Sequence, residues 1–315
     1  MNQSNTSGKS SPPSPKSGSP DRFGYSWSLF TELSALQATQ FAGWTSALPE
    51  SLWPGASFLD VGCGMGRNTV WAMQKGAGPG IAIDVDERSL DTARRNTQQW
   101  MDRVDVRWMS AYEIKFTEQF DIVFSIGVIH HLEHPELAVQ NMVKATKSGG
   151  RVLVWLYGRE NNGWIVYLFN PIRRFLFSRL PIGITNGLAW VLAAILLLLL
   201  RMGWGRLPYH DLLRKTTFRH IKHITFDHML PHIALYYRRE EAEALLKQAG
   251  LVHVRSEWVN EMSWSVCGQK PMNTVLDTCS VSNCVAPGFP ETTSLERNPL
   301  PVNLGGKTPS HLHES

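Results

Sequence analysis

The feature that most constrains the fold of this chain is a glycine-rich turn placed directly after an apolar segment. Residues 57–61 (SFLDV) are followed by Gly62, Gly64 and Gly66, and then by a stretch with helical spacing, TVWAMQKG. Glycine lets the backbone turn tightly and approach a ligand without a Cβ in the way. Amides at the start of the following helix can then face an anionic group. A turn of this kind is shared by nicotinamide-binding and flavin-binding proteins, among others.

Short apolar runs alternate with helix-forming stretches around this turn and determine the fold class. The runs that predict strands lie at 57–61, 81–85, 104–109, 120–126 and 151–157. The last helix between them is expected to stop at Gly149-Gly150, after two lysines. A further helix over 239–249 and a strand pair at 252–259 and 262–270 follow. The alternation predicts an α/β protein with a doubly wound, mostly parallel sheet.

The two ends of the 315-residue chain differ in composition from the part between them. Residues 1–20 and 271–315 are rich in Ser, Pro, Gly, Thr and Asn without a sustained hydrophobic period, and they predict disordered tails. The folded part is therefore expected over 21–270. We expect an N-terminal helical cover over 21–50, a ligand-binding core over 51–160, an insertion over 161–230, and a closing helix and strand pair over 231–270.

Charge and cysteine content exclude several classes of protein. A net charge of +4 gives no reason to expect a nucleic-acid partner. Four cysteines without a CxxC pair exclude a disulfide scaffold and favour a reducing compartment. The polar start lacks the apolar stretch of a secretory signal, so we expect a cytoplasmic protein. The eleven histidines do not combine with cysteines or carboxylates at ligand spacing, so no metal site is expected.

Two acidic residues narrow the choice of ligand for the glycine-rich turn. Asp60 lies two residues before Gly62, and the third glycine of the turn comes two residues after the second rather than three. This spacing points away from dinucleotide binding and toward S-adenosylmethionine, which has no pyrophosphate to cradle. Asp84 closes the second predicted strand, and the resemblance described next implies that its carboxylate accepts hydrogen bonds from both ribose hydroxyls of the cofactor.

Three segments of the chain resemble the motifs of the class I S-adenosylmethionine-dependent methyltransferases. They are FLDVGCGMGRNT, IAIDVDERSLDTARRN and FDIVFSIGVIHHLEHPELAVQNMVKATKSGGRVLVW, in the family's order and at its distances. The resemblance is strong over 50–160 and loose over 230–270. It implies a Rossmann-like methyltransferase fold with seven strands, here with a helical insertion, and a methyltransferase (EC 2.1.1.-) that uses S-adenosyl-L-methionine.

The resemblance also implies which residues contact the cofactor. These are Asp60, Gly62, Cys63, Gly64, Gly66, Asp84, Val85, Ser110, Ala111 and Ser125. One position departs from the family, which usually has an Asp-Ala pair after the third strand where this chain has Ser110-Ala111. A serine hydroxyl accepts a hydrogen bond from the adenine amino group more weakly than a carboxylate, so adenine recognition is less secure than ribose recognition.

The insertion contains the most apolar part of the chain. Residues 180–200 carry no charge and are bracketed by Arg179 and Arg201, which matches the ~20 residues of a membrane span. A single crossing would place strands of one sheet on opposite sides of the bilayer, so a spanning helix is not expected. A buried cap helix and a monotopic helix in one leaflet both stay open. Nine basic residues and one acidic residue between 173 and 222 favour contact with an anionic membrane.

Candidate acceptor-site residues cluster just before the last helix. In methyltransferases of this build, this segment commonly forms the floor of the acceptor pocket. His228 is the first candidate for a catalytic base, oriented by Asp227, and His223 is the second. The candidate pocket residues are Tyr25, His130, Tyr236 and Tyr237.

The sequence therefore favours a methyltransferase that acts on a small or lipophilic acceptor, by O- or C-methylation rather than N-methylation. Peripheral membrane contact through 173–222 is the expected partner interaction besides the substrate. The alternative is a non-catalytic cofactor-binding or membrane-recruited interaction protein that retains the same fold. A nicotinamide oxidoreductase is a third interpretation, which a test of NAD binding would decide.

Overall fold

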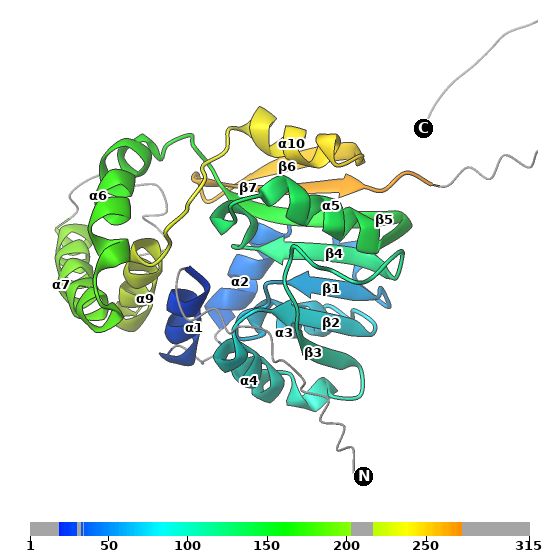
Figure 1. Ribbon diagram of the computed structural model, residues 1–315, viewed down its shortest axis with the longest axis horizontal. Coiled ribbons are helices and arrows are strands. Elements are labelled where there is room, and N and C mark those ends of the chain that lie inside the picture. The colour runs from blue at the N-terminus through cyan, green and yellow to red at the C-terminus, as the bar shows by residue number, and fades with distance from the viewer. Residues whose placement is uncertain (1–18, 30–32, 34, 203–216, 273–315) are drawn as a thin grey trace, which may run out of the picture. The chain divides into compact units, whose positions relative to one another are not determined.

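Seven strands form one sheet in the order β3-β2-β1-β4-β5-β7-β6 (Figure 1). The computed structural model describes residues 19–29, 33, 35–202 and 217–272. The strands are β1 (Phe58–Val61), β2 (Gly80–Asp84), β3 (Val104–Trp108), β4 (Phe120–Ile126), β5 (Thr146–Tyr157), β6 (Val252–Val259) and β7 (Ser263–Gln269). β7 runs antiparallel to both of its neighbours, and the pairs among β1 to β5 are parallel. The prediction of a doubly wound, mostly parallel sheet with seven strands is confirmed.

Helices cover both faces of the sheet, because alternate side chains of each strand point to opposite sides. Leu59 and Val61 pack with α5 (Pro135–Ala145) and α10 (Arg239–Gln248). Phe58, directly before Leu59 in β1, packs on the opposite face. That face is covered by α2 (Ala35–Trp44), α3 (Arg67–Gln74) and α4 (Glu87–Asn96). Short 3₁₀ turns η1 (Glu50–Leu52), η2 (Gln98–Trp100) and η3 (Ile129–His131) connect these elements.

Two predicted boundaries differ from the structure. The helix expected to stop at Gly149-Gly150 ends at Ala145, and the residues that follow begin β5. Thr146 closes the helix by donating its hydroxyl to the Met142 carbonyl at 2.8 Å, in an extended backbone conformation that suits a β-branched residue. At the other end of the chain, α1 (Ser19–Leu29) begins two residues inside the expected tail. The remainder of that tail, and 273–315 of the second tail, lie outside the described residues.

The insertion lies beyond the carboxyl ends of the parallel strands, as a separate group of helices on the left of Figure 1. It contains η4 (Ile165–Phe169), α6 (Asn170–Phe175), η5 (Phe177–Arg179), α7 (Ile182–Arg201) and α9 (Phe218–Met229). Its two ends are joined, since Gly158 and Tyr237 form a parallel bridge. The Tyr237 N–H donates to Tyr157 O at 2.9 Å, and the Arg159 N–H donates to Tyr237 O at 2.9 Å.

α7 is the apolar helix of the insertion, and it is long and apolar enough to cross a membrane by length and composition. It packs on α9 through one stripe, and four of its residues are buried: Thr185, Ala189, Ala193 and Leu200. The other side exposes large apolar side chains to solvent, among them Trp190 and Leu198. The structure does not bury α7 as the cap-helix interpretation expects, because among the described residues α9 covers one stripe of it and the large apolar side chains of the other side are exposed.

Candidate functional site

The glycine turn connects the end of β1 to the start of α3. Gly62, Gly64 and Gly66 all have positive φ values, between 53° and 77°, a region that side chains with a Cβ rarely adopt. A Cβ on Gly62 would also lie 2.4 Å from Val128 Cγ2. The N–H groups of Gly62 and Cys63 both donate to the Ile83 carbonyl, at 2.8 and 2.9 Å. The turn is therefore held against the end of β2, where Asp84 lies.

Asp84 presents a carboxylate held by three backbone amides. Its Oδ2 accepts the N–H of Gly64 at 2.9 Å, and its Oδ1 accepts the N–H groups of Val85 and Asp86 at 2.7 and 3.0 Å. Burial raises the pKa of Asp84 in spite of these bonds. Two carboxylate oxygens offer about four acceptor positions, so Asp84 keeps the capacity to accept a ligand hydroxyl.

Asp60 is fully buried at the end of β1, two residues before the turn. Its Oδ2 accepts the Thr69 hydroxyl at 2.7 Å, and its Oδ1 has no hydrogen-bond partner within the described part of the chain. Burial raises the pKa of Asp60 to about 7, against the lowering effect of the Thr69 bond. A buried carboxylate oxygen without a partner is costly, and a positively charged ligand beside the turn would compensate it.

The other predicted cofactor residues divide into two groups. Ser110 and Ala111 follow β3 at the same edge of the sheet, and the Ser110 hydroxyl accepts the Tyr112 N–H at 3.2 Å. Cys63 packs its buried side chain with α4, so only its backbone belongs to the turn. Ser125 donates its hydroxyl to the Val61 carbonyl at 2.8 Å, which joins β4 to β1. The structure therefore gives Cys63 and Ser125 supporting positions rather than side chains that face a ligand.

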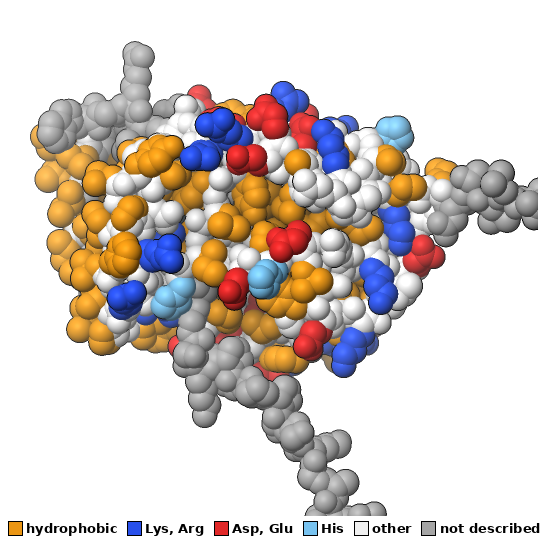
Figure 2. All heavy atoms as spheres, turned by 45° about the horizontal axis from the view of Figure 1, so that its top comes forward, with side chains coloured by type: hydrophobic (Ala, Val, Ile, Leu, Met, Phe, Trp, Pro, Cys, Tyr) orange, Lys and Arg blue, Asp and Glu red, His pale blue; other side chains and the backbone are white. Residues whose placement is uncertain are grey.

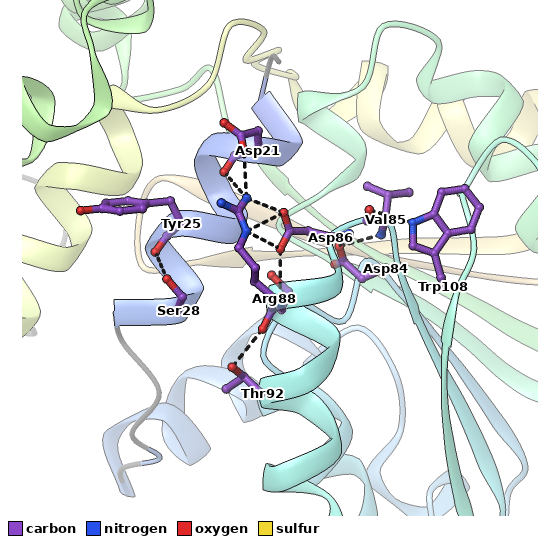
Figure 3. Close-up of polar contacts among 10 residues, drawn as sticks. Asp21, Tyr25, Ser28, Asp84, Val85, Asp86, Arg88, Thr92 and Trp108 are labelled. Atoms are coloured by element: carbon purple, nitrogen blue, oxygen red, sulfur yellow. Dashed lines mark hydrogen bonds and ion pairs between the residues drawn. The ribbon is translucent and has the colours of Figure 1, made fainter. Parts of the chain in front are cut away.

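Helix α1 covers this edge and is attached to α4 by Arg88 (Figure 3). The Arg88 guanidinium contacts the carboxylates of Asp21 on α1 and of Asp86, the N-cap residue of α4. A Cβ on Gly24 would lie 2.1 Å from the Asp86 carboxylate, so the two helices are in close contact. Farther along α1, Trp27 Nε1 lies 3.2 Å from the position of a Cβ on Gly64. α1 is thus a cover over the glycine turn.

These residues fit S-adenosylmethionine. The turn leaves backbone open to a ligand, the Asp84 carboxylate would hold ribose hydroxyls, and the partnerless Asp60 oxygen suits a cation. The Trp108 indole N–H donates to the Val85 carbonyl at 2.9 Å and joins the ends of β2 and β3 (Figure 3). Val85 therefore lies between the carboxylate at Asp84 and the segment at 110–111, where the family places the adenine.

A cavity of about 400 Å³ adjoins the carboxyl ends of β4 and β5. Its floor is formed by Ile126 at the end of β4, by Gly127 directly after it, and by Trp155 and Tyr157 of β5. Residues of α1, α2, α7 and α9 form the walls, and Arg67, the first residue of α3, also contacts it. The order of the sheet reverses between β1 and β4, and ligands of open α/β sheets bind outside the strand ends at such a point.

Of the two histidines after β4, His131 lines the cavity. Its Nδ1 lies 2.8 Å from the Ile233 carbonyl, which assigns the proton of the neutral ring to Nδ1 and leaves Nε2 as an acceptor. Burial lowers the pKa of His131 to about 4. His130 is fully buried and stacks on Tyr157 with ring centroids 3.8 Å apart. The residue that lines the cavity is therefore His131 and not the predicted His130, because successive residues of a 3₁₀ turn point in different directions.

The cavity contains both predicted catalytic residues, but the carboxylate pairs with His223 instead of His228. Asp227 and His228 both line it, but Asp227 Oδ2 pairs with His223 Nε2 at 3.1 Å, one turn back on α9. The Ser26 hydroxyl donates to Asp227 Oδ1 at 2.8 Å. Burial would raise the pKa of Asp227, but His223 and Ser26 outweigh it and hold this pKa below its usual range. Sequence reasoning ranked His223 second because the helix that aligns residues 223 and 227 was not predicted.

Burial lowers the pKa of His220 and of His228 to about 4. With His131, the cavity therefore contains three imidazoles that are neutral at neutral pH, and one carboxylate that is paired. Neutral imidazoles can accept hydrogen bonds from an acceptor without placing a net charge in an apolar cavity.

Two of the three predicted tyrosines lie outside the cavity. Tyr236 lines it, and burial raises its pKa. Tyr237 packs against the core that α5 and α10 share with the sheet. Tyr25 extends from α1 toward Phe226 of α9, with ring centroids 6.3 Å apart. The cavity contains Phe23 and Trp27 from α1 instead, which lie on the side of this helix that faces the sheet.

Part of the chain is similar to known proteins. Residues 59–154 match the family model described as "Methyltransferase domain". The chain is 35% identical over 101 residues to the ribosomal protein L11 methyltransferase of Neisseria gonorrhoeae, a match that covers 32% of each chain. The corresponding protein of Burkholderia multivorans is 33% identical over 106 residues, or 33% of each chain. The chain thus spans about a third of the length of the curated relatives it matches.

The solved structures that resemble this chain are more distant from it in sequence. A Thermotoga maritima protein, described as an S-adenosylmethionine-dependent methyltransferase and possible histamine N-methyltransferase, is 16% identical with a TM-score of 0.47. This match covers 79% of this chain and 99% of that one. Human N-acetylserotonin methyltransferase, solved with S-adenosylmethionine, is 13% identical with a TM-score of 0.48, over 82% and 58% of the two chains.

Proposed function

Residues 59–154 form a class I S-adenosylmethionine-dependent methyltransferase domain, and from this premise we propose that the chain methylates a small lipophilic molecule. The cofactor of the domain is S-adenosylmethionine, which supplies an electrophilic methyl group when bound. The turn at 62–66 and Asp84 would hold it, and α1 would close over it. What distinguishes this chain from other proteins with such a domain is the acceptor side.

The cavity beside the domain carries the proposal. Its volume of about 400 Å³ falls in the range of small-molecule sites. Aromatic and aliphatic side chains from seven elements form most of its surface. Its ionisable groups are the histidines, Asp227, Arg67, Tyr157 and Tyr236. Such a lining favours an apolar acceptor with one polar reactive group, held in a site from which water is largely excluded.

His223 is the residue we assign as the base, with Asp227 in support. The carboxylate at 3.1 Å stabilises the protonated imidazole, so His223 suits the task of taking a proton from a hydroxyl or an activated C–H. His228 and His131 would orient the reactive group as neutral hydrogen-bond acceptors, since burial keeps their pKa values near 4. This arrangement fits O- or C-methylation, in which the acceptor loses a proton.

The walls of the cavity also connect it to the exposed apolar side of α7. Leu192 and Leu196 of this helix line the cavity, while Val191 and Ile195 beside them are exposed. Trp164 lines the cavity and is 51% exposed. We therefore propose that the enzyme works in the cytoplasm at a membrane surface, from which an apolar acceptor reaches the cavity along α7.

Methyl transfer from S-adenosylmethionine with a tritiated methyl group tests the function. Long-chain phenols, quinols and fatty acids would be compared with ribosomal protein L11 as acceptors. We expect label in the solvent-extractable fraction. Leu196→Trp, which fills the cavity, should abolish this transfer without changing the cofactor Kd, whereas Leu198→Trp on the exposed side of α7 should not.

Other outcomes separate the alternatives. Label found in L11 alone would replace the small acceptor by a protein. Tight cofactor binding without transfer to any acceptor would favour a non-catalytic protein that retains the fold.

A further inference from the structure

A second cavity, of about 490 Å³, lies in the insertion between α6, η5 and residues 232–235. Its lining contains three arginines and one histidine: Arg173, Arg174, Arg179 and His232. It contains no acidic side chain, and the described residues 161–202 and 217–226 contain none either. Positive groups without a carboxylate between them repel one another, so this cavity is built for a negatively charged ligand.

Arg173 is the strongest sign of that ligand. Its side chain is 1% exposed, and its Nη2 donates to Asn170 Oδ1. Nε and Nη1 are buried, and neither makes a well-formed hydrogen bond within the described residues; the nearby Tyr236 hydroxyl is the group whose pKa this guanidinium lowers against the effect of burial. A buried guanidinium with open donors costs free energy unless a ligand engages it. Its planar donor arrangement matches phosphate oxygens.

The chain around the cavity is held in place from outside the insertion. Arg22 of α1 donates to the carbonyls of Phe177 and Leu180, at 2.9 and 3.0 Å, and to the Thr185 hydroxyl at 3.1 Å. These bonds fix the connection from α6 to α7, in which Arg179 lies. The Arg179 guanidinium also lies 5.8 Å from the Phe175 ring. The site therefore consists of one buried guanidinium, Arg173, with the exposed side chains of Arg174 and Arg179 at its mouth, on a backbone that Arg22 holds in place.

The apolar surface continues directly from this cavity. At the end of α6, Phe175 is 66% exposed, and the next residue, Leu176, is 49% exposed. The exposed side of α7 adds further large apolar residues: Ile184, Leu188, Trp190, Val191, Ile195 and Leu198. Figure 2 shows orange side chains gathered over this part of the molecule, on the left. A membrane interface has a layer of acyl chains and a layer of headgroups. The exposed apolar side chains match the first layer, and the adjacent cationic side chains match the second.

We propose that the cavity at Arg173, Arg174 and Arg179 binds the phosphate of an anionic phospholipid, while the exposed side of α6 and α7 inserts among its acyl chains. This site would attach the enzyme to anionic lipid at the membrane surface proposed above. It is separate from the site of methyl transfer. It rests on the proposed membrane placement and not on the identity of the acceptor.

Flotation of the full chain with vesicles tests this site, with no cofactor or acceptor present. The vesicles would contain either phosphatidylcholine alone or equal parts of phosphatidylcholine and phosphatidylglycerol. We expect the chain to float with the mixed vesicles and much less with phosphatidylcholine alone. The double variant Arg174→Gln, Arg179→Gln should partition about thirtyfold less onto the mixed vesicles, from two arginines near an anionic surface.

Matched variants separate the site from overall charge and overall apolarity. Arg103→Gln with Arg107→Gln removes two exposed arginines at β3 and should float like the parent chain. Val191→Asn with Ile195→Asn should lose binding to both kinds of vesicle. Met101→Asn with Leu137→Asn, two exposed apolar residues of the core domain, should not. Thermal melting checks that every variant folds.

Three results would overturn the proposal. One is a chain that stays unbound by mixed vesicles at low salt, and another is equal loss of flotation in both arginine pairs. The third is calorimetric binding of inorganic phosphate, dependent on Arg174 and Arg179, by a chain that no vesicle retains. That result would show a soluble phosphate compound as the ligand. Because methyl transfer is measured separately with dissolved acceptors, failure of either proposal leaves the other testable.

Discussion

At the scale of single residues, a substitution of Asp84 should weaken cofactor binding while the chain stays folded. Replacing it by Asn keeps the side chain's size and one acceptor oxygen but removes its charge. We expect the Kd for S-adenosylmethionine to rise about tenfold to a hundredfold, since hydrogen bonds to a charged group contribute about 1.5–3 kcal/mol. Isothermal calorimetry measures this change. Asp105→Asn, at the exposed start of β3, is the control, and an unchanged Kd in Asp84→Asn would place the ribose elsewhere.

Asp60 should make stability depend on pH. Its pKa is about 7 in the folded chain and about 4 when unfolded, so the folded state holds a proton that the unfolded state has lost. The free energy of unfolding should then fall as pH rises from about 4 to about 7, by at most about 1.4 kcal/mol per pH unit from this group. Denaturant titrations of the parent and Asp60→Asn at several pH values measure it. Parallel curves for the two proteins would show that Asp60 keeps an ordinary pKa.

The base assignment predicts a specific kinetic pattern. His223→Gln and Asp227→Asn should each lower kcat by about 10²-fold to 10⁴-fold, the usual contribution of general base catalysis, with little change in the cofactor Kd. His220→Gln removes another cavity histidine of the same helix and should have a much smaller effect. A loss of equal size in all three variants, or one seen only in KM, would indicate binding of the acceptor rather than proton transfer.

The residues around the cofactor were more predictable than those around the acceptor, and the reason is local. Gly62 to Gly66, Asp60 and Asp84 follow strand ends within 25 residues of one another, and strand alternation alone brings them together. The pairing of His223 with Asp227 required knowledge of α9. Its spacing of four residues is the signal that could have indicated the pair once the segment was assigned as a helix.

At the scale of elements, α1 is held over the site by the ion pair of Asp21 with Arg88 on the side of α4, and by hydrogen bonds of Arg22 and Ser26 on the side of the insertion. Arg88→Gln should increase hydrogen exchange across 19–29 while changing global stability by less than about 1 kcal/mol, because surface ion pairs contribute little. Exchange measured by mass spectrometry, with Arg94→Gln on the same helix as control, tests this. Unchanged exchange in α1 would show that its apolar contacts suffice.

Strands and core helices were predicted within a few residues, because their hydrophobic periods are distinct. The insertion was not, because an apolar run of about 20 residues has the same pattern in a buried helix and at a membrane. Its exposure depends on what packs against it. Here α9 covers one stripe of α7, and only the tertiary structure shows that large apolar side chains on its other side are exposed within the described part of the chain.

At the scale of the whole molecule, the two proposals together predict activation by membranes. The apparent KM for an apolar acceptor should fall when it is delivered in vesicles of phosphatidylcholine and phosphatidylglycerol rather than dissolved. High salt should reverse this effect, because it screens the attraction to anionic lipid. Initial rates at several salt concentrations measure both effects. A KM that is the same with and without vesicles would show that the acceptor reaches the cavity from water.

The insertion departs from the sheet and returns to it at one point, where Gly158 and Tyr237 form a bridge. A segment with adjoining ends can be lengthened, shortened or exchanged without altering the register of the strands around it. The two proposals above place the membrane contact and much of the acceptor site in this segment, whereas the glycine turn and Asp84 lie outside it. If both proposals hold, residues 159–236 can be exchanged for another segment while the methyltransferase domain stays the same. Such an exchange would change the acceptor of the enzyme and its location in the cell.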